Sequence, residues 1–157
     1  MASRDKDCIL KFGEQMTREE KVIWAAGFVD GEGCISIIKN RHAGCVRGYY
    51  YTMRVAVSQR GRRPLDELAK LFGGVVRPAQ RGSDLFVWVA STQMGADALN
   101  EMLPYMIVKK QQAKVAISFA NRRIERGYGR RKPDGTMQEF ITTRDEKDFH
   151  ALRAAKR

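Results

Sequence analysis

Hydrophobic residues recur along this chain at helical and at alternating spacings, in stretches bounded by turn-forming residues. Residues 19–31 carry apolar side chains at a helical period behind a Thr17-Arg-Glu-Glu20 capping box, which predicts a helix that ends before Gly33. Residues 49–59, YYYTMRVAVSQ, alternate between an apolar and a wetter set, which predicts a half-buried strand. Together with the β-rich run at 34–39, this strand makes a long hairpin.

The second half of the chain alternates helices and strands again. Its patterning predicts a helix at 64–72, strands at 75–81 and 84–90, and helices at 92–103, at 108–126 and from 143 to about 155. The order is αββαββα followed by helical additions, which places the chain in the α+β class. We expect a curved antiparallel sheet with helices on one face and its polar, basic strand faces turned the other way.

The length of 157 residues and the hydrophobic content of 43% predict a single domain over residues 1–157. Within it, we expect residues 1–16 to be an N-terminal extension and residues 127–157 to be a basic loop followed by the C-terminal helix. No window of about 18 apolar residues exists, so no membrane partner is expected. The three cysteines lack a CxxC spacing, which argues against zinc and favours a reducing, intracellular compartment.

Positive charge is unevenly placed along the chain. The formal net charge is +11 and the pI is about 9.9, a balance that favours a polyanionic partner. Residues 34–65 hold seven Lys or Arg and no carboxylate, and residues 104–157 hold 14 basic and six acidic residues. A merely solvated basic surface is the alternative, but single-sign stretches repel themselves and usually have a use. On an uncovered sheet face, this charge predicts a groove-filling surface for double-stranded DNA, with RNA as a further possibility.

The predicted first helix ends in an unusual sequence, Trp24-Ala-Ala-Gly-Phe-Val-Asp-Gly-Glu-Gly33. Gly27 and Gly31 lie on one helix face, and each costs about 1 kcal/mol relative to alanine, which makes sense if something approaches the backbone closely. Asp30 and Glu32 lie at the helix C-terminus, where the dipole disfavours anions, so a divalent metal ion would compensate them. The alternative is an ordinary helix with a glycine C-cap and solvent-facing acids.

The stretch AAGFVDGEG from Ala25 to Gly33 closely resembles the LAGLIDADG motif, and the chain is similar to the single-motif, homodimeric branch of the LAGLIDADG homing endonucleases over roughly residues 17–125. Ala25 departs from the usual leucine, and Glu32 replaces the commoner aspartate while it keeps the charge. The resemblance implies the αββαββα homing-endonuclease fold, whose sheet forms a DNA-binding saddle. It also implies a sequence-specific enzyme that cuts both strands of a long pseudo-palindromic site and leaves short 3′ overhangs.

The resemblance further implies that two copies pair through their motif helices and share metal ions at the helix ends. The expected cofactor is Mg²⁺, with Mn²⁺ as a plausible substitute. The residues that carry over are the metal ligands Glu32 and Gly33, the catalytic residues Glu32, Gln59 and Lys109, and the dimer-interface residues Ala26, Gly27, Asp30 and Gly31. Lys110 takes the role of Lys109 if the register differs by one residue.

In the family, outward side chains of the hairpins read bases in the major groove and other basic residues contact phosphates. The residues expected at this surface are Ser36, Ile38, Asn40, Arg41, His42, Arg47, Tyr50, Thr52, Arg54, Arg77, Ala79, Arg81, Asp84, Phe86, Arg130, Arg131 and Lys132. Phe86 and Trp88 fit this surface poorly, because aromatic groups on this face would have to stack on sugars or pack against thymine methyl groups. The alternative is an inverted strand, with Leu85, Val87 and Val89 under another helix while the aromatic rings cover a turn.

Three other functions compete with this interpretation. An intron RNA-splicing maturase shares the fold, and a basic surface suits RNA equally well. A non-cleaving DNA-binding regulator has the fold without the activity, but Glu32, Gln59 and Lys109 are all present. The third alternative is a structural nucleic-acid-binding protein, a class that would not explain why Gly27 and Gly31 share one helix face that ends in Glu32. A bacterial or phage cytoplasm and an organelle, chloroplast or mitochondrion, fit the sequence equally.

Overall fold

The computed structural model describes residues 16–45, 47–126 and 143–156. Its elements in chain order are α2 (Arg18–Glu32), β1 (Gly33–Arg41), β2 (Tyr49–Arg60), α3 (Arg63–Phe72), β3 (Val75–Pro78), β4 (Leu85–Ser91), α4 (Thr92–Met102), a 3₁₀ turn η1 (Leu103–Tyr105), α5 (Lys110–Arg126) and α6 (Thr143–Ala154). The predicted αββαββα order is confirmed. The third strand is shorter than predicted, and residues 79–84 form the turn that follows it.

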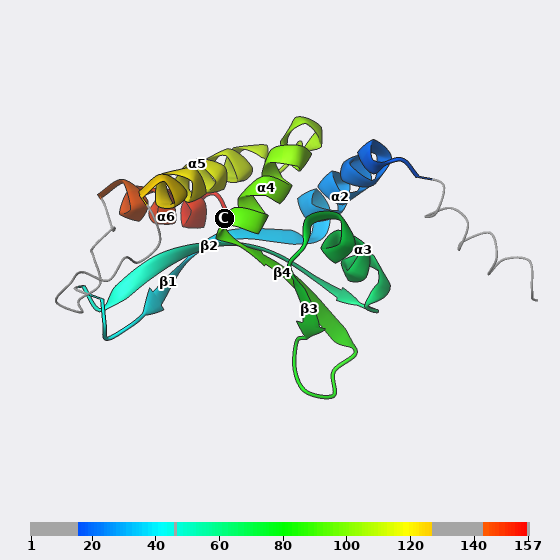
Figure 1. The fold of residues 1–157 in the computed structure, drawn as a ribbon, viewed down its shortest axis with the longest axis horizontal. Coiled ribbons are helices and arrows are strands. Elements are labelled where there is room, and N and C mark those ends of the chain that lie inside the picture. Colours follow the sequence, from blue (N-terminus) through cyan, green and yellow to red (C-terminus); the bar gives the residue numbers. More distant parts are fainter. Residues whose placement is uncertain (1–15, 46, 127–142, 157) are drawn as a thin grey trace, which may run out of the picture.

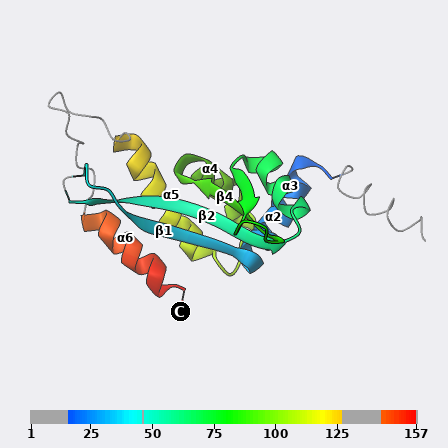
Figure 2. The same ribbon diagram turned by 90° about the horizontal axis from the view of Figure 1, so that it is seen from below.

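The strands form one four-stranded sheet in the order β1-β2-β4-β3, and every neighbouring pair is antiparallel. In Figure 1 the sheet is curved, and the described helices all lie above it, so the lower, concave face carries none of the described elements. Seen from that side in Figure 2, β1 and β2 run across α5, and α6 lies along the outer edge of β1. The predicted α+β saddle is therefore confirmed.

The core lies between the sheet and the helices, as the alternation of β1 and β2 predicts. The odd-numbered residues of these strands face the helices, and Ile35, Met53, Val55 and Val57 are fully buried. From above, α2, α4 and α5 contribute a second layer of buried residues: Val22, Ala25, Ala26, Val29, Ala96, Leu99, Met102, Ala113, Ala116, Phe119 and Ala120. Small alanines in this layer let the helices lie close to the sheet.

The aromatic residues of the second hairpin face the helices, whereas the sequence predicted that they face away from them. Val57 pairs with Trp88, so Trp88 faces the helices and is 0% exposed. Its indole Nε1 donates to the carbonyl oxygen of Gly73 at 2.9 Å, which supplies the partner that a buried indole needs. A Cβ on Gly74 would lie 2.8 Å from that nitrogen, so the glycine at this position makes room for the ring.

The expectation that Phe86 and Trp88 look away from the helices was therefore wrong. Phe86 packs partly buried against the core on the same side as Trp88. The residues between them, Leu85, Val87 and Val89, lie on the face opposite the helices. The alternative arrangement, with these three residues under a helix, was also wrong. The hydrogen bond from the Trp88 indole to Gly73, at the end of α3, keeps Trp88 and Phe86 on the helix side of the sheet instead.

Helix α6 closes the core at the outer edge of the sheet. Phe149 lies against Tyr51 with 5.1 Å between ring centroids, and Leu152 is buried. Glu146 accepts a hydrogen bond from the Tyr49 hydroxyl at 2.8 Å, which ties the start of α6 to β2. Within the described segments, no helix has the length and hydropathy needed to cross a membrane.

Candidate metal and nucleic-acid site

Helix α2 has one buried and one exposed side. The Thr17 capping box starts the helix, with the Glu20 backbone N–H donating to the Thr17 hydroxyl at 3.2 Å and the Thr17 N–H donating to the Glu20 carboxylate at 2.7 Å. Val22, Ala25, Ala26 and Val29 turn into the core. We call the other side, formed by Ile23, Trp24, Gly27 and Gly31, the free face of α2, and all four residues are exposed.

The two glycines of the free face have open space in front of them. A Cβ added at Gly27 or at Gly31 meets no atom within 4 Å, so this chain's own packing gives no reason for either glycine. Ala26, predicted on the same strip, is instead 0% exposed within the core, because it shares its side of the helix with Val22 and Val29. Its placement on the free face was wrong.

Next to the free face, the segment between η1 and α5 exposes two large apolar side chains. Ile107 is 86% exposed and Val108 is 77% exposed. Sequence reasoning missed Ile107 and Val108, because their proximity to the glycines depends on how the start of α5 docks on α2. It also missed Ile23 and Trp24 as part of this surface, although their helical spacing from the two glycines is visible in the sequence.

Asp30 makes that docking contact. Its Oδ2 accepts the backbone N–H groups of Ile107 and Val108 at 2.7 and 2.8 Å, and its Oδ1 accepts that of Lys109 at 2.7 Å. Burial raises the pKa of the Asp30 carboxyl, but the three backbone donors and the Lys109 charge outweigh it, so the pKa lies below the ordinary 3.8. Asp30 thus fixes the start of α5 to the end of α2 within one chain.

Lys109 caps the C-terminus of α2 from the other side. Its Nζ donates to the carbonyl oxygens of Val29 at 3.3 Å, of Asp30, and of Gly31 at 3.2 Å. These are orphan carbonyls at the negative end of the helix dipole, so a cation is favoured there. Lys110 lies one residue further along, as the first residue of α5.

Glu32 is the last residue of α2, and its side chain is exposed. Among the residues that the structure describes, it has no hydrogen-bond or ion-pair partner. No group of three or more His, Cys, Asp or Glu side chains in the described segments could enclose a metal ion. At this helix end, which favours a positive charge, one chain therefore presents the Glu32 carboxylate without a partner among the described residues.

Gly33 joins α2 directly to β1. A Cβ there would lie 2.4 Å from the carbonyl oxygen of Val29, so only glycine fits. Gly33 of β1 pairs with Val57 of β2. Gln59 lies two residues beyond Val57 on β2, about 7 Å from it at the usual rise of a strand. Gln59 shares the helix side of the sheet with Val57, near the end of α2, and its Oε1 accepts the Arg60 backbone N–H at 3.2 Å.

The sheet face opposite the helices, called the open face here, carries most of the predicted base-reading side chains. Cross-strand pairs set Ser36 beside Arg54, Ile38 beside Thr52 and Asn40 beside Tyr50. The Asn40 amide donates to the Thr52 hydroxyl at 2.9 Å, and the buried Nε of Arg54 has no partner in the described structure. This outer half of the open face is rich in hydrogen-bonding groups.

The remaining predicted nucleic-acid residues lie at the ends of the hairpins. Arg41, His42 and Arg47 surround the β1–β2 turn, and Arg77 extends from β3 onto the open face. The turn after β3 holds Ala79, Arg81 and Asp84. A carboxylate oxygen of Asp84 lies 3.8 Å from a guanidinium nitrogen of Arg60. Arg130, Arg131 and Lys132 fall outside the described residues.

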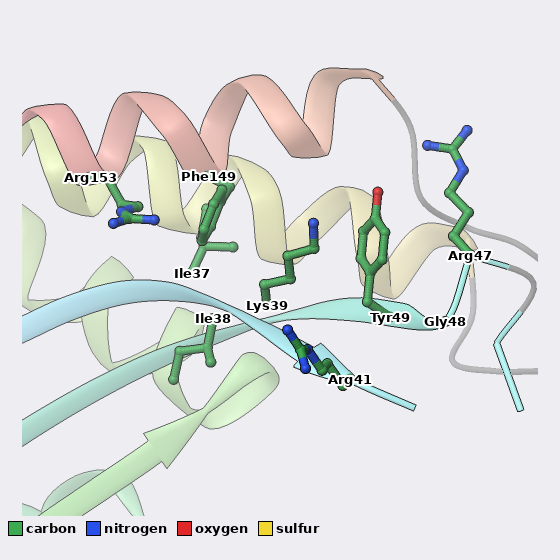
Figure 3. A pocket seen from close by; sticks show the side chains of 9 residues that line it. All are labelled: Ile37, Ile38, Lys39, Arg41, Arg47, Gly48, Tyr49, Phe149 and Arg153. Atoms are coloured by element: carbon green, nitrogen blue, oxygen red, sulfur yellow. The ribbon is translucent and has the colours of Figure 1, made fainter. Parts of the chain in front are cut away.

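A pocket of about 850 Å³ lies beside this turn, between the edge of β1 and α6. Figure 3 shows its lining side chains, which include four cations and no carboxylate: Lys39, Arg41, Arg47 and Arg153. Lys39 lies over the Tyr49 ring at 3.7 Å, and Arg153 lies over the Phe149 ring at 5.6 Å. Sequence reasoning counted Lys39 in the basic stretch but did not assign it to a site. It missed Arg153, because only the packing of α6 brings that residue to β1. We call this the edge pocket.

Comparison with known proteins agrees with this geometry. The family model described as LAGLIDADG endonuclease matches residues 25–121, more than half of the chain, from the middle of α2 into α5. The chain belongs to the LAGLIDADG endonuclease family. The matched range includes Glu32 and Lys109, which lie at the end of α2, and Gln59, which lies two residues beyond the strand partner of Gly33.

Individual members of the family resemble this chain over different lengths. The DNA endonuclease I-CvuI of Chlorella vulgaris is 31% identical over 102 residues, and the match spans 63% of each protein. A crystal structure of I-CvuI in complex with its target superposes with a TM-score of 0.63 at 21% identity, covering 88% of this chain and 96% of that one. The structure of an archaeal intron-encoded homing endonuclease, I-Vdi141I, complexed with DNA superposes with a TM-score of 0.71 at 19% identity. The superposition covers 88% of this chain and 86% of that one.

The LAGLIDADG homing endonuclease I-SmaMI bound to cleaved DNA differs in length. Its TM-score is 0.61 at 16% identity, and the superposition covers 87% of this chain but only 43% of that one. This chain therefore corresponds to somewhat less than half of that family member.

Proposed function

We propose that this member of the LAGLIDADG family is a sequence-specific DNA endonuclease that acts as a homodimer, with its two copies joined through the free face of α2. The observation that carries the proposal is the Glu32 carboxylate, which has no partner among the described residues. It lies at the end of the helix face on which a Cβ at Gly27 or Gly31 would meet no described atom within 4 Å. The related I-CvuI is named a DNA endonuclease, and its structure was solved with target DNA.

Pairing of the free faces would complete the site. Helices whose facing residues are glycines can approach closely, and Ile23, Trp24, Ile107 and Val108 supply apolar area around them. A contact of a surface with its own copy has two-fold symmetry, so the two Glu32 residues would lie near the axis. Two such chains correspond to the greater length of I-SmaMI, of which this chain covers 43%.

The donor set fits a divalent cation such as Mg²⁺, with Mn²⁺ as a substitute. The Glu32 carboxylate and the Gly33 carbonyl oxygen are hard oxygen ligands at a helix end that favours positive charge. Structures of I-CvuI with DNA were obtained in the presence of Ca²⁺ or Mg²⁺. When bound there, such a cation would supply Lewis-acid activation of water and stabilisation of the leaving 3′ oxygen.

The chain's own groups do the remaining work. Lys109, held against the α2 carbonyls, places an ammonium group beside Glu32, where negative charge develops on the phosphate during cleavage. Gln59 offers its amide from the end of β2 to order water at this site. The two-fold arrangement cuts both strands across a long pseudo-palindromic site and leaves short 3′ overhangs.

DNA would lie along the open face, where Arg54, Asn40 and Thr52 offer hydrogen bonds to base edges. Arg41, Arg47 and the edge pocket would contact phosphates at the outer end of each half-site. A DNA substrate also places the enzyme where a genome is found, in a bacterial cell or an organelle.

The test compares the wild-type protein with Glu32→Gln and with Glu125→Gln, a matched substitution of an exposed acid in α5. Each is incubated with randomised duplex DNA in Mg²⁺ or in Ca²⁺, and the ends produced are sequenced. We expect defined breaks with 3′ overhangs from the wild type and Glu125→Gln in Mg²⁺ alone, and binding without breaks from Glu32→Gln.

Other outcomes select the competing functions. Enrichment of one duplex sequence by all three proteins without breaks would indicate a regulator. Absence of any preference among duplexes, together with binding to structured intron RNA, would indicate a maturase.

A further inference from the structure

The half of the open face nearest the α2–β1 junction carries an apolar strip, formed by Val75, Leu85, Val87 and Val89. One cross-strand row runs from Val75 through Val89 to Ala56, and the next sets Val87 between Arg77 and Ser58. Val75 is 60% exposed. The strip begins one residue away from Gly33, because Cys34 pairs with Ala56.

Leu85, Val87 and Val89 are partly exposed, and none of them belongs to the hydrophobic core or packs against it. Strand β4 already fills the helix side of the sheet with Trp88 and Ala90, and a strand with one solvated face normally alternates with polar residues. Here both faces of β4 are apolar. A contiguous apolar patch on a solvent-facing surface indicates a binding site.

The charges around the strip are mainly positive, although Asp84 lies within 3.8 Å of Arg60. Arg54, Arg60 and Arg77 flank it on the open face, and the outer half of the same face is polar and basic. This combination complements a polyanion. It therefore fits a DNA groove better than an apolar protein surface.

In the major groove, the C5-methyl of thymine is the one apolar group on any base edge, whereas every other group is a donor or an acceptor that valine and leucine would leave unpaired. We infer that the apolar strip selects thymine, on either strand, in the part of each half-site nearest the cut. This inference rests on the proposed function for the placement of DNA. It adds that the inner base pairs are read by methyl contact and the outer ones by hydrogen bonds.

The experiment removes single methyl groups from the DNA. Each thymine of a recovered target is replaced in turn by deoxyuridine, which keeps base pairing and every hydrogen-bonding group, and binding to Glu32→Gln is measured in Ca²⁺. We expect thymines facing the strip to lose about fourfold in affinity each, the factor expected for burying one methyl carbon. Thymines under Thr52 and Asn40 should change less than half as much.

Val87→Thr and Val89→Thr, made in the Glu32→Gln protein, complete the cycle. Threonine keeps the branched shape that suits a strand but places a hydroxyl against the methyl group. Where a deoxyuridine penalty arises from the strip, it should disappear in one of these variants. Their urea unfolding midpoints are measured alongside, so that loss of folding is recognised.

The outcomes separate this inference from the proposed function. Cleavage by the wild-type protein without a methyl-sensitive thymine would overturn the inference and leave the nuclease intact. Methyl-sensitive binding without cleavage would support the inference and oppose the nuclease. Sedimentation without DNA adds a further arm, because a change of oligomeric state in Val87→Thr would assign the strip to contact between copies and overturn the inference.

Discussion

Asp30 and Lys109 are joined at two points. The Asp30 carboxylate accepts the Lys109 backbone N–H at 2.7 Å, while the Lys109 ammonium donates to the Asp30 backbone carbonyl oxygen. The end of α2 and the start of α5 are thus held together by a residue pair that lies beside Glu32. The same pair stabilises the fold and positions the charge proposed for catalysis, and these two roles can be separated by experiment.

Asp30→Asn should destabilise the protein by about 1–3 kcal/mol, because three backbone donors lose a charged acceptor. The folded-state pKa of Asp30 is depressed, so its stabilising contribution is fully present above the unfolded value of about 3.8. It is lost as the pH falls through the lower folded value. Urea unfolding at neutral pH and near pH 3 measures both effects.

The control for that substitution is Glu101→Gln, which breaks the exposed ion pair with Arg18 and should cost less than about 1 kcal/mol. If Asp30→Asn were as stable as the control at neutral pH, the proposed bracing role of its carboxylate would be wrong.

Lys109→Met should reduce the rate of DNA cleavage by about 10²–10³-fold, the usual loss when one electrostatic stabiliser is removed. Binding to the uncut target should change little, because Lys109 contacts the protein's own carbonyl groups. Lys110→Met is the matched control and should cleave at nearly the wild-type rate. The reverse result, with Lys110 essential and Lys109 dispensable, would shift the predicted register by one residue.

Gly27→Leu should leave the folded chain intact and prevent it from dimerising. A Cβ at this position meets no atom of its own chain, and leucine favours a helix over glycine by roughly 1 kcal/mol. Analytical ultracentrifugation should show a monomer, and cleavage should be lost with the dimer. A dimer that persists in this variant would place the interface elsewhere.

Gly33→Ala is the contrasting substitution. Its Cβ would lie 2.4 Å from the Val29 carbonyl oxygen, so we expect a loss of folding stability that Gly27→Leu does not show. The two variants together distinguish a glycine required by the fold from one required by a partner.

Arg41→Gln and Arg153→Gln should each reduce the slope of log affinity against log salt concentration by about one, if each arginine of the edge pocket contacts one phosphate. The preferred sequence should not change, because phosphate contacts do not read bases. Arg18→Gln, far along α2 and paired with Glu101, serves as the control and should leave the slope unchanged.

Local patterns predicted α2 and the first hairpin well. The Thr17 capping box and the alternation of residues 49–59 determine the ends and faces of these elements without help from distant contacts. The roles assigned to Glu32, Gln59 and Lys109 remain predictions. Their arrangement near one helix end depends on strand register and on the docking of α5, which sequence patterns do not contain.

The predictions that failed depend on contacts between distant residues. Strand β4 is apolar at every position from Leu85 to Ala90, so its period could not tell which set faces inward. The hydrogen bond of the Trp88 indole to Gly73, which lies 15 residues away in the sequence, decides which residues face inward. Ala26 was misplaced because a small side chain suits a core layer as well as a helix-pairing strip.

The direct passage from Glu32 to Gly33, with no loop between α2 and β1, has a consequence for engineering new specificities. Glu32, the proposed cutting group, is followed directly by the first residue of β1, the first strand of the proposed reading surface. The distance from the cut phosphate to the first base read would therefore be fixed by the backbone. Side chains on the open face could then be exchanged to recognise other sequences while the cut keeps its place. An inserted residue at this junction would instead move every contact along the DNA.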